Sequence, residues 1–254
     1  MKFSANLGFL WADCPLPDAI RAAKAAGFDA VECHWPYDTP PDVVRDALSD
    51  TGLRMLGLNT ARGNVAAGEN GMSAVPGRQE EACRAIDEAL SYATAIGAGN
   101  VHVMAGVASG DAAHLCFIDA LQCASNRAAR HGITILIEPL NRFDAPGYFL
   151  RNLDQAAQII AEVAVPNLKL MFDCYHVART EGDVLRHLSN LQPIIGHIQF
   201  ARVPDRGPPD GGDLDYRKVF AWIEASGWET PLGAEYKPGE NTDATLGWLT
   251  WARG

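Results

Sequence analysis

Four side chains that carry oxygen stand at or beside the ends of short apolar runs. They are Glu138, Asp173, Gln199 and Glu235. The clearest of these runs is 133–137, which is largely β-branched and lies between Gly132 and Pro139. Proline has no N–H to donate, so a strand cannot continue through Pro139. A run of this kind is typical of a strand buried on both faces of a parallel sheet, with Glu138 at its carboxyl end.

Adjacent strands lie about 4.8 Å apart, so four neighbouring strand ends would gather these side chains around one small volume. Three carboxylates that close together cannot all stay ionised unless a positive charge lies among them. Carboxylate and amide oxygens favour a hard cation, Mg²⁺ or Mn²⁺, over zinc. The alternative is one or two ion pairs with Arg or Lys at the same place. One glutamate after one strand would mean little, but the recurrence on four strands favours a metal site.

Several other polar residues are expected near these strand ends. His176 lies three residues after Asp173 and is a candidate to hydrogen-bond a substrate oxygen. His102 and His34 each fall at the end of a predicted strand, where either histidine alone is weak evidence.

The predicted seventh strand and the loop after it add two further candidates. His197 and Gln199 are two residues apart and therefore share one face of the strand, with His197 one layer deeper. Arg206 could supply a positive charge for an anionic substrate, and Arg202 is its rival.

Eight strands and eight helices are predicted to alternate along the chain. The strands are expected at 3–7, 30–33, 53–58, 101–104, 133–137, 168–172, 194–200 and 232–234. No stretch resembles a linker, so we predict an α/β protein with a single domain, 1–254, folded as a (β/α)8 TIM barrel. A doubly wound open sheet is the alternative, but no G-x-G-x-x-G follows the first strand.

The segment 60–76 is the longest stretch without clear periodicity, and it follows a predicted strand end. A loop of this length is usually functional or disordered. We therefore weigh equally a lid that closes over the site and a disordered surface loop.

Composition narrows the classes of partner. The chain has 254 residues and a formal net charge of −10, without a basic run, which argues against nucleic acid and anionic membranes. No apolar run is long enough to span a bilayer and no signal peptide is apparent. The six cysteines show no CxxC spacing, which is typical of free thiols, and we expect a cytoplasmic protein.

Several motifs spread along the chain resemble the hydroxypyruvate isomerase family, within the xylose-isomerase-like TIM barrels. They are Ser4–Leu7, Gly27–Glu32, Ala66–Gly71, Val101–Gly106, Ile137–Asn141, Phe172–His176, His197–Gln199 and Gly233–Tyr236. One departure concerns the third strand: family members tend to have a proline-containing turn after its final asparagine. Here Asn59 is followed by Thr60-Ala61-Arg62, and the extra arginine at the mouth suits a different or larger acid.

The resemblance implies an isomerase that interconverts hydroxypyruvate and tartronate semialdehyde, with Glu138 and Glu235 as the acid–base pair. It implies a divalent metal, Mg²⁺ or Mn²⁺, held by Glu138, Asp173, Gln199 and Glu235. His176, Arg206, His102 and Glu69 are the substrate-binding candidates. Epimerase relatives usually have a histidine where Gln199 stands, which favours the hydroxypyruvate isomerase branch. Relatives commonly assemble, so a homo-oligomer is expected.

The implied reaction removes a proton next to a carbonyl, passes through an enediolate and returns the proton to the neighbouring carbon. The same two glutamates would also serve an isomerase of a longer 2-oxo acid, an oxo-tetronate, or a ketose 3-epimerase. An endonuclease of this superfamily would need a histidine-rich zinc cluster and a basic groove. The net negative charge of the chain argues against this alternative. A sugar- or acid-binding barrel without catalysis would not need the paired glutamates.

Overall fold

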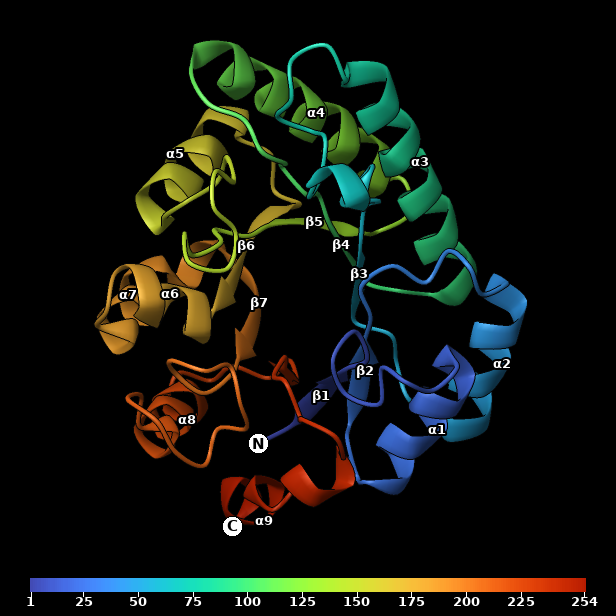
Figure 1. Cartoon of the computed structure of the whole chain (residues 1–254), viewed down its shortest axis with the longest axis vertical. Helices are drawn as coiled ribbons and strands as arrows, with labels where there is room; N and C mark the ends of the chain where they lie inside the picture. Colours follow the sequence, from blue (N-terminus) through green and yellow to red (C-terminus); the bar gives the residue numbers. More distant parts are fainter.

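A computed structural model describes all residues, 1–254, and shows a ring of helices around eight parallel strands (Figure 1). The strands are β1 (Phe3–Asn6), β2 (Ala30–Glu32), β3 (Gly57–Asn59), β4 (Asn100–His102), β5 (Thr134–Ile137), β6 (Leu168–Asp173), β7 (Ile195–Phe200) and β8 (Leu232–Ala234). The helices are α1 (Leu16–Ala25), α2 (Pro41–Thr51), α3 (Gln79–Ile96), α4 (Asp111–Ala129), α5 (Leu153–Val163), α6 (Cys174–Thr180), α7 (Val184–Leu191), α8 (Tyr216–Ala225) and α9 (Trp248–Arg253). This is the predicted (β/α)8 barrel.

The strands pair in the order β2-β1-β8-β7-β6-β5-β4-β3. The remaining contact, between β2 and β3, is a single parallel bridge between Val31 and Met55, so the barrel closes there with few hydrogen bonds. Because all strands run the same way, their carboxyl ends meet at one mouth, where polar side chains can converge.

Local sequence explains where several helices begin and end. Prolines occupy the first turns of α1 and α2, where a missing N–H costs nothing. Gly52 and Gly97 follow α2 and α3 in the left-handed conformation that favours glycine. Asn152 caps α5 by accepting the Gln155 N–H at 2.8 Å.

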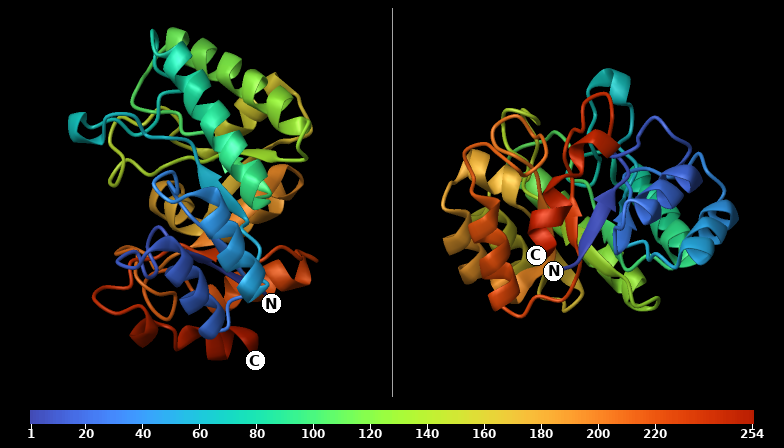
Figure 2. Two further views of the ribbon diagram at one scale, coloured as in Figure 1. Left: turned by 90° about the vertical axis from the view of Figure 1, so that its right-hand side faces the viewer. Right: turned by 90° about the horizontal axis from the view of Figure 1, so that it is seen from below.

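An aromatic cluster joins the two ends of the chain. Phe3 on β1, Phe200 on β7 and Trp248 on α9 have ring centroids 5.0 to 5.9 Å apart. Phe220 of α8 lies 5.0 Å from Phe200. These buried rings fix the last helix against the first strand, and the two termini lie close together (Figure 2).

Two elements differ from the prediction. The third strand begins at Gly57 rather than residue 53, because the chain before it makes only the Val31–Met55 bridge. Helix α6 was not predicted; it follows β6 directly, and its seven residues are too short to show a periodic apolar face.

The segment 60–76 is folded onto the mouth of the barrel. It contains one turn of 3-10 helix, Val65–Ala67, and projects from the barrel body (Figure 2). Its base is fixed, because Gly71 bridges Ala105 and the Ala74 N–H bonds to the Ala105 carbonyl at 2.7 Å. Whether it closes as a lid stays a prediction. No helix in the structure has the length and apolar character needed to cross a membrane.

Candidate active site

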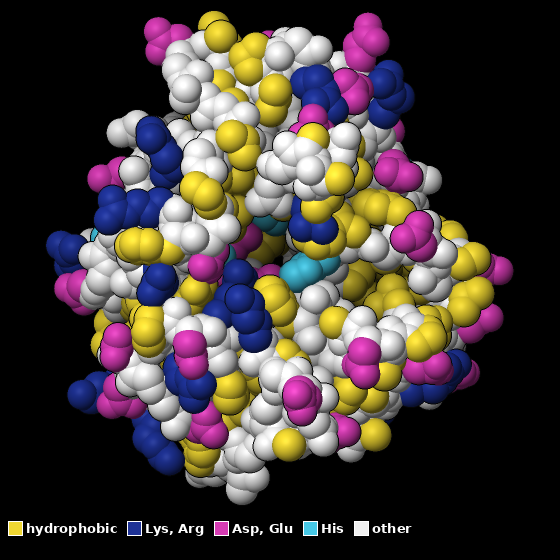
Figure 3. Space-filling view, in the orientation of Figure 1, with side chains coloured by type: hydrophobic (Ala, Val, Ile, Leu, Met, Phe, Trp, Pro, Cys, Tyr) yellow, Lys and Arg dark blue, Asp and Glu magenta, His cyan; other side chains and the backbone are white.

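The four predicted oxygen-bearing side chains all lie at the carboxyl ends of the strands. Glu138 and Glu235 directly follow β5 and β8, Asp173 ends β6, and Gln199 is the penultimate residue of β7. All four are buried. Figure 3 looks into this mouth and shows acidic and histidine side chains inside a central hollow, with basic side chains at its rim.

Asp173 has two differently used oxygens. Its Oδ1 accepts the Tyr175 N–H at 2.8 Å and so caps α6. Its Oδ2 is buried without a hydrogen-bond partner. Burial raises the pKa of Asp173 to about 7, although Arg206 opposes the shift. Capping of the short helix therefore fixes this carboxyl and leaves its second oxygen free to bind another group.

The orientation of Gln199 is set by Glu32. The Gln199 amide nitrogen donates to Glu32 Oε1 at 2.8 Å, and His197 Nε2 lies 2.6 Å from Glu32 Oε2. Gln199 Oε1 is consequently left buried without a partner. The contact requires glycine at 233, since a Cβ there would lie 2.5 Å from Glu32 Oε1. His197 does share the inward face with Gln199, as the spacing predicts.

Glu138 lies between two histidines. Its Oε2 is 3.7 Å from His102 Nδ1, and its Oε1 is 3.9 Å from His176 Nε2 and has no hydrogen-bond partner. Burial, followed by the nearby charges of Glu235 and Asp173, raises the pKa of Glu138 well above its usual value.

Glu235 has the opposite environment. Burial alone would raise its pKa, but Arg206 and His34 outweigh burial and lower the pKa. Arg206 donates to Oε2 at 2.5 Å, while Asn6 and His34 approach Oε1 at 3.0 and 2.9 Å. The surroundings of the two glutamates therefore shift their pKa values in opposite directions, the arrangement expected of an acid–base pair.

Arg206 is a partner of the carboxylates in this structure. Besides Glu235, it lies 3.7 Å from Asp173 Oδ2. The rings of Phe9 and Tyr175 flank its guanidinium at 4.8 and 5.1 Å. The ion-pair alternative raised by the sequence is thus present for Glu235. Its Nε–H is buried without a partner, and the predicted role in binding the substrate anion stays a prediction.

The protonated nitrogen of His176 is defined by Asn141. Asn141 Oδ1 accepts the N–H groups of Phe143 and Asp144, both at 3.0 Å, so its side-chain nitrogen must be the atom 2.8 Å from His176 Nδ1. The Asn141 backbone N–H also donates to Nδ1, at 3.0 Å. With Nδ1 an acceptor, the neutral ring carries its proton on Nε2, which lies 3.7 Å from Asp173 Oδ2. Burial lowers the pKa of His176 to about 3, which keeps the ring neutral.

The donor set fits a hard divalent cation. Glu138 Oε1, Asp173 Oδ2 and Gln199 Oε1 are three buried oxygens without hydrogen-bond partners. Glu138, Asp173 and His176 also offer atoms within 4.8 Å of one another. We favour oxygen ligands over His176, because its Nε2 carries the proton in the tautomer defined above.

The remaining predicted residue, Glu69, is not brought to this site. It lies in the segment 60–76, where it pairs with Arg78 and accepts the Asn64 N–H at 2.6 Å. Conversely, reasoning from the sequence missed the roles of Glu32, Asn6 and Asn141. Glu32 ends a strand as Glu138 and Glu235 do, so the same pattern could have identified it; the two asparagines carry no comparable signal.

Comparison with known proteins gives the class to which this arrangement belongs. The sequence model of the xylose isomerase-like TIM barrel family matches residues 20–250. The chain therefore belongs to the xylose isomerase-like TIM barrel family.

Particular relatives are similar over nearly their whole length. A 2-oxo-tetronate isomerase from Cupriavidus necator is 42% identical, covering 98% of this chain and 97% of that protein. The hydroxypyruvate isomerase of Escherichia coli K12 is 34% identical, covering 98% of each chain. A crystal structure from Brucella melitensis, described as an AP endonuclease of family 2, is 36% identical with a TM-score of 0.94 and 98% coverage of each chain.

Proposed function

We propose that this chain is an isomerase of short 2-oxo acids, with hydroxypyruvate or the four-carbon 2-oxo-tetronate as substrate. The observation that carries the proposal is the pair of buried glutamates that directly follow strands β5 and β8, which have different partners and lie at one mouth. The names of the relatives at 34 and 42% identity support it.

The two substrates share one chemistry. In each, the carbonyl moves from C2 to C3: a proton leaves C3, an enediolate forms, and a proton is added to C2, while the hydroxyl proton passes between the two oxygens. Glu235 is the base at C3 and Glu138 the acid at C2, and their roles exchange in the reverse direction. The Nε2–H of His176 is placed to donate to a substrate oxygen.

Mg²⁺ or Mn²⁺, when held by Glu138, Asp173 and Gln199 beside Glu235, supplies positive charge for the enediolate oxygens. The bond from the Gln199 amide nitrogen to Glu32 leaves the Gln199 carbonyl oxygen free for that ion. Asn6 holds Glu235 and Glu32 together, since its amide nitrogen lies 3.0 Å from each carboxylate. The burial of the four side chains limits water around the reacting carbons.

An endonuclease is less well supported by the site. His197 is engaged with Glu32 and His34 with Glu235, so these two ring nitrogens already have carboxylate partners. The chain is also strongly acidic, at −10, which opposes binding to a phosphate backbone.

The direct test is a substrate panel. Purified protein is incubated with hydroxypyruvate, 2-oxo-tetronate and a free ketose, each with Mg²⁺, with Mn²⁺ and with a chelator, and products are followed by NMR. We expect metal-dependent isomerisation of at least one 2-oxo acid. Turnover of the ketose alone would favour the epimerase alternative, and turnover of none would refute the proposal.

A further inference from the structure

A second positive group stands at the mouth, on the side of the segment 60–76. Arg62 lies with its guanidinium carbon 3.7 Å from the centroid of the Trp35 ring. No carboxylate lies within 4.0 Å of it, whereas Arg206 and Arg202 are paired with Glu235 and Asp205. Arg62 therefore keeps its charge and its N–H donors available.

The tryptophan that supports Arg62 is joined to the catalytic pair. The Trp35 ring packs against His34 with centroids 4.9 Å apart, and His34 Nε2 lies 2.9 Å from Glu235. Trp35 Nε1 also donates to the Thr60 carbonyl at 3.1 Å. Contacts thus run from Arg62 through Trp35 and His34 to Glu235, and the Trp35 ring is held by His34 on one side and by the Thr60 carbonyl on the other.

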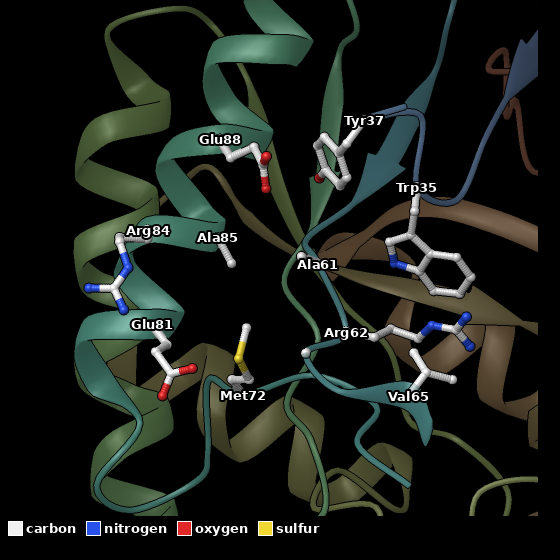
Figure 4. A pocket seen from close by; sticks show the side chains of 11 residues that line it. Trp35, Tyr37, Ala61, Arg62, Val65, Met72, Glu81, Arg84, Ala85 and Glu88 are labelled. Carbon is white, nitrogen blue, oxygen red and sulfur yellow. The ribbon is translucent and has the colours of Figure 1, made fainter. Parts of the chain in front are cut away.

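A cavity of about 560 Å³ opens beside Arg62. Figure 4 shows Trp35, Tyr37 and Arg62 along one wall, and Glu81, Arg84 and Glu88 on helix α3 along the other.

We propose that Arg62, held on Trp35, binds the carboxylate of the substrate, and that the chain accordingly selects sugar acids over neutral sugars. This inference rests on the proposed function. It gives the anion-binding role to Arg62 in place of Arg206, whose charge is occupied by Glu235. A planar guanidinium suits a carboxylate because two parallel N–H donors meet two oxygens.

The test measures binding of unreactive ligands to the intact, Mg²⁺-loaded protein by calorimetry. The acids are erythronate and glycerate, and the neutral control is erythritol. The variants are Arg62→Gln and Arg62→Lys, with Arg84→Gln as the matched control, since Arg84 lines the same cavity from α3. Circular dichroism and melting confirm that each variant is folded.

We expect Arg62→Gln to weaken erythronate binding by about 10- to 100-fold and to leave erythritol unchanged, because a charge-assisted pair is lost. Arg62→Lys should restore part of the affinity, and Arg84→Gln should match the wild type. Added salt should weaken acid binding by the wild type and have little effect on Arg62→Gln.

Equal losses for acid and polyol, an unchanged affinity for the acid, or no acid binding by the wild type would overturn the inference. The outcome is separable from the proposed function. If Arg62 governs acid binding but no 2-oxo acid is isomerised, the proposed reaction fails and the anion site stands. If a 2-oxo acid is isomerised but the affinity for acids is the same in the wild type and in Arg62→Gln, the proposed reaction stands and the inference fails.

Discussion

The contrast between Arg62 and Arg206 shows how the partners of a residue decide its role. Both are arginines at the mouth of the barrel, yet Arg206 bonds to Glu235 and Arg62 stacks on an aromatic ring. Arg206 also adopts a left-handed backbone with φ 59, uncommon for a residue with a side chain. Its carbonyl accepts the Lys237 N–H at 2.7 Å, which helps fix that conformation beside the carboxylates.

Replacing Arg206 by alanine should change the pH dependence of catalysis. Arg206 lowers the pKa of Glu235, so its removal raises that pKa, and the base must be ionised to act. The acid limb of the kcat/KM profile should therefore move to higher pH, by about one to three units. An unshifted acid limb together with an increased KM for the 2-oxo acid would instead support Arg206 as a substrate-binding residue.

Glu32 should control metal affinity without touching the metal. Glu32→Gln weakens the bond that turns the Gln199 oxygen inward, and Gly233→Ala crowds the same contact by another route. We expect each to weaken Mn²⁺ binding by about 10- to 100-fold, measured by calorimetry on folded protein. Glu88→Gln, on the far wall of the cavity beside Arg62, is the control. Wild-type Mn²⁺ affinity in both variants would show that Glu32 does not control metal binding.

At the scale of elements, a close backbone contact at Gly71 helps to position the segment 60–76. Gly71 has φ 104, and a Cβ at this position would lie 2.5 Å from the Met104 carbonyl oxygen. Gly68 has a similar φ of 84, but a Cβ there would meet nothing within 4 Å. The two glycines therefore separate the cost of the backbone conformation from the cost of displacing the segment.

Gly71→Ala should expose the segment to proteolysis and raise KM, because the base of the segment can no longer rest on the barrel. Gly68→Ala should cause only the modest loss of stability expected for alanine at positive φ, with KM close to wild type. Limited proteolysis and steady-state kinetics are measured in parallel. Identical behaviour of the two variants would mean that the docking of this segment has no bearing on the site.

The elements were largely predictable because their signals are local. Apolar runs, helical spacing and turn residues predict the eight strand–helix units, and the family and the barrel are confirmed. Helix α6 was missed because Asp173 caps it immediately after β6. An aspartate at a strand end was interpreted only as a site residue and not as a helix cap. Strand β3 was predicted too long because apolar residues before Gly57 are buried without forming a ladder.

The candidate site was predictable as a set of positions but not as a set of partners. Strand ends locate Glu138, Asp173, Gln199 and Glu235. Three features depend on residues that are distant in sequence: the partner of Arg206, the hydrogen bond from Gln199 to Glu32 and the tautomer of His176. Nothing in local spacing indicates which of these groups meet.

For the whole molecule, buried neutral histidines should make stability depend on pH. Burial lowers the pKa of His102 to about 4. Between pH 6.5 and 4, His102 therefore binds a proton in the unfolded chain but not in the folded chain. This contribution to stability is complete above about pH 6.5 and is lost as the pH falls toward 4. Glu138 and Asp173 act in the opposite sense, because their pKa values are raised.

The histidine contribution is isolated by comparison with His102→Asn. With a chelator present, the free energy of unfolding of the wild type should fall more steeply than that of the variant as pH drops from 6.5 to 4. The difference should approach about 1.4 kcal/mol per pH unit at its steepest. Parallel curves for the two proteins, from urea titrations, would show that His102 is protonated equally in both states.

The central claim is that Glu235 removes the C3 proton of a 2-oxo acid and Glu138 delivers a proton to the neighbouring C2. The measurement is NMR of hydroxypyruvate, or of 2-oxo-tetronate if only that acid is turned over, in D₂O with wild type, Glu138→Gln and Glu235→Gln. We predict at least about 100-fold lower kcat in each variant, with substrate still bound. Deuterium should continue to enter C3 in Glu138→Gln, where the base remains, and should not enter in Glu235→Gln. Isomerisation by either variant at a rate near that of the wild type would contradict the two-glutamate mechanism.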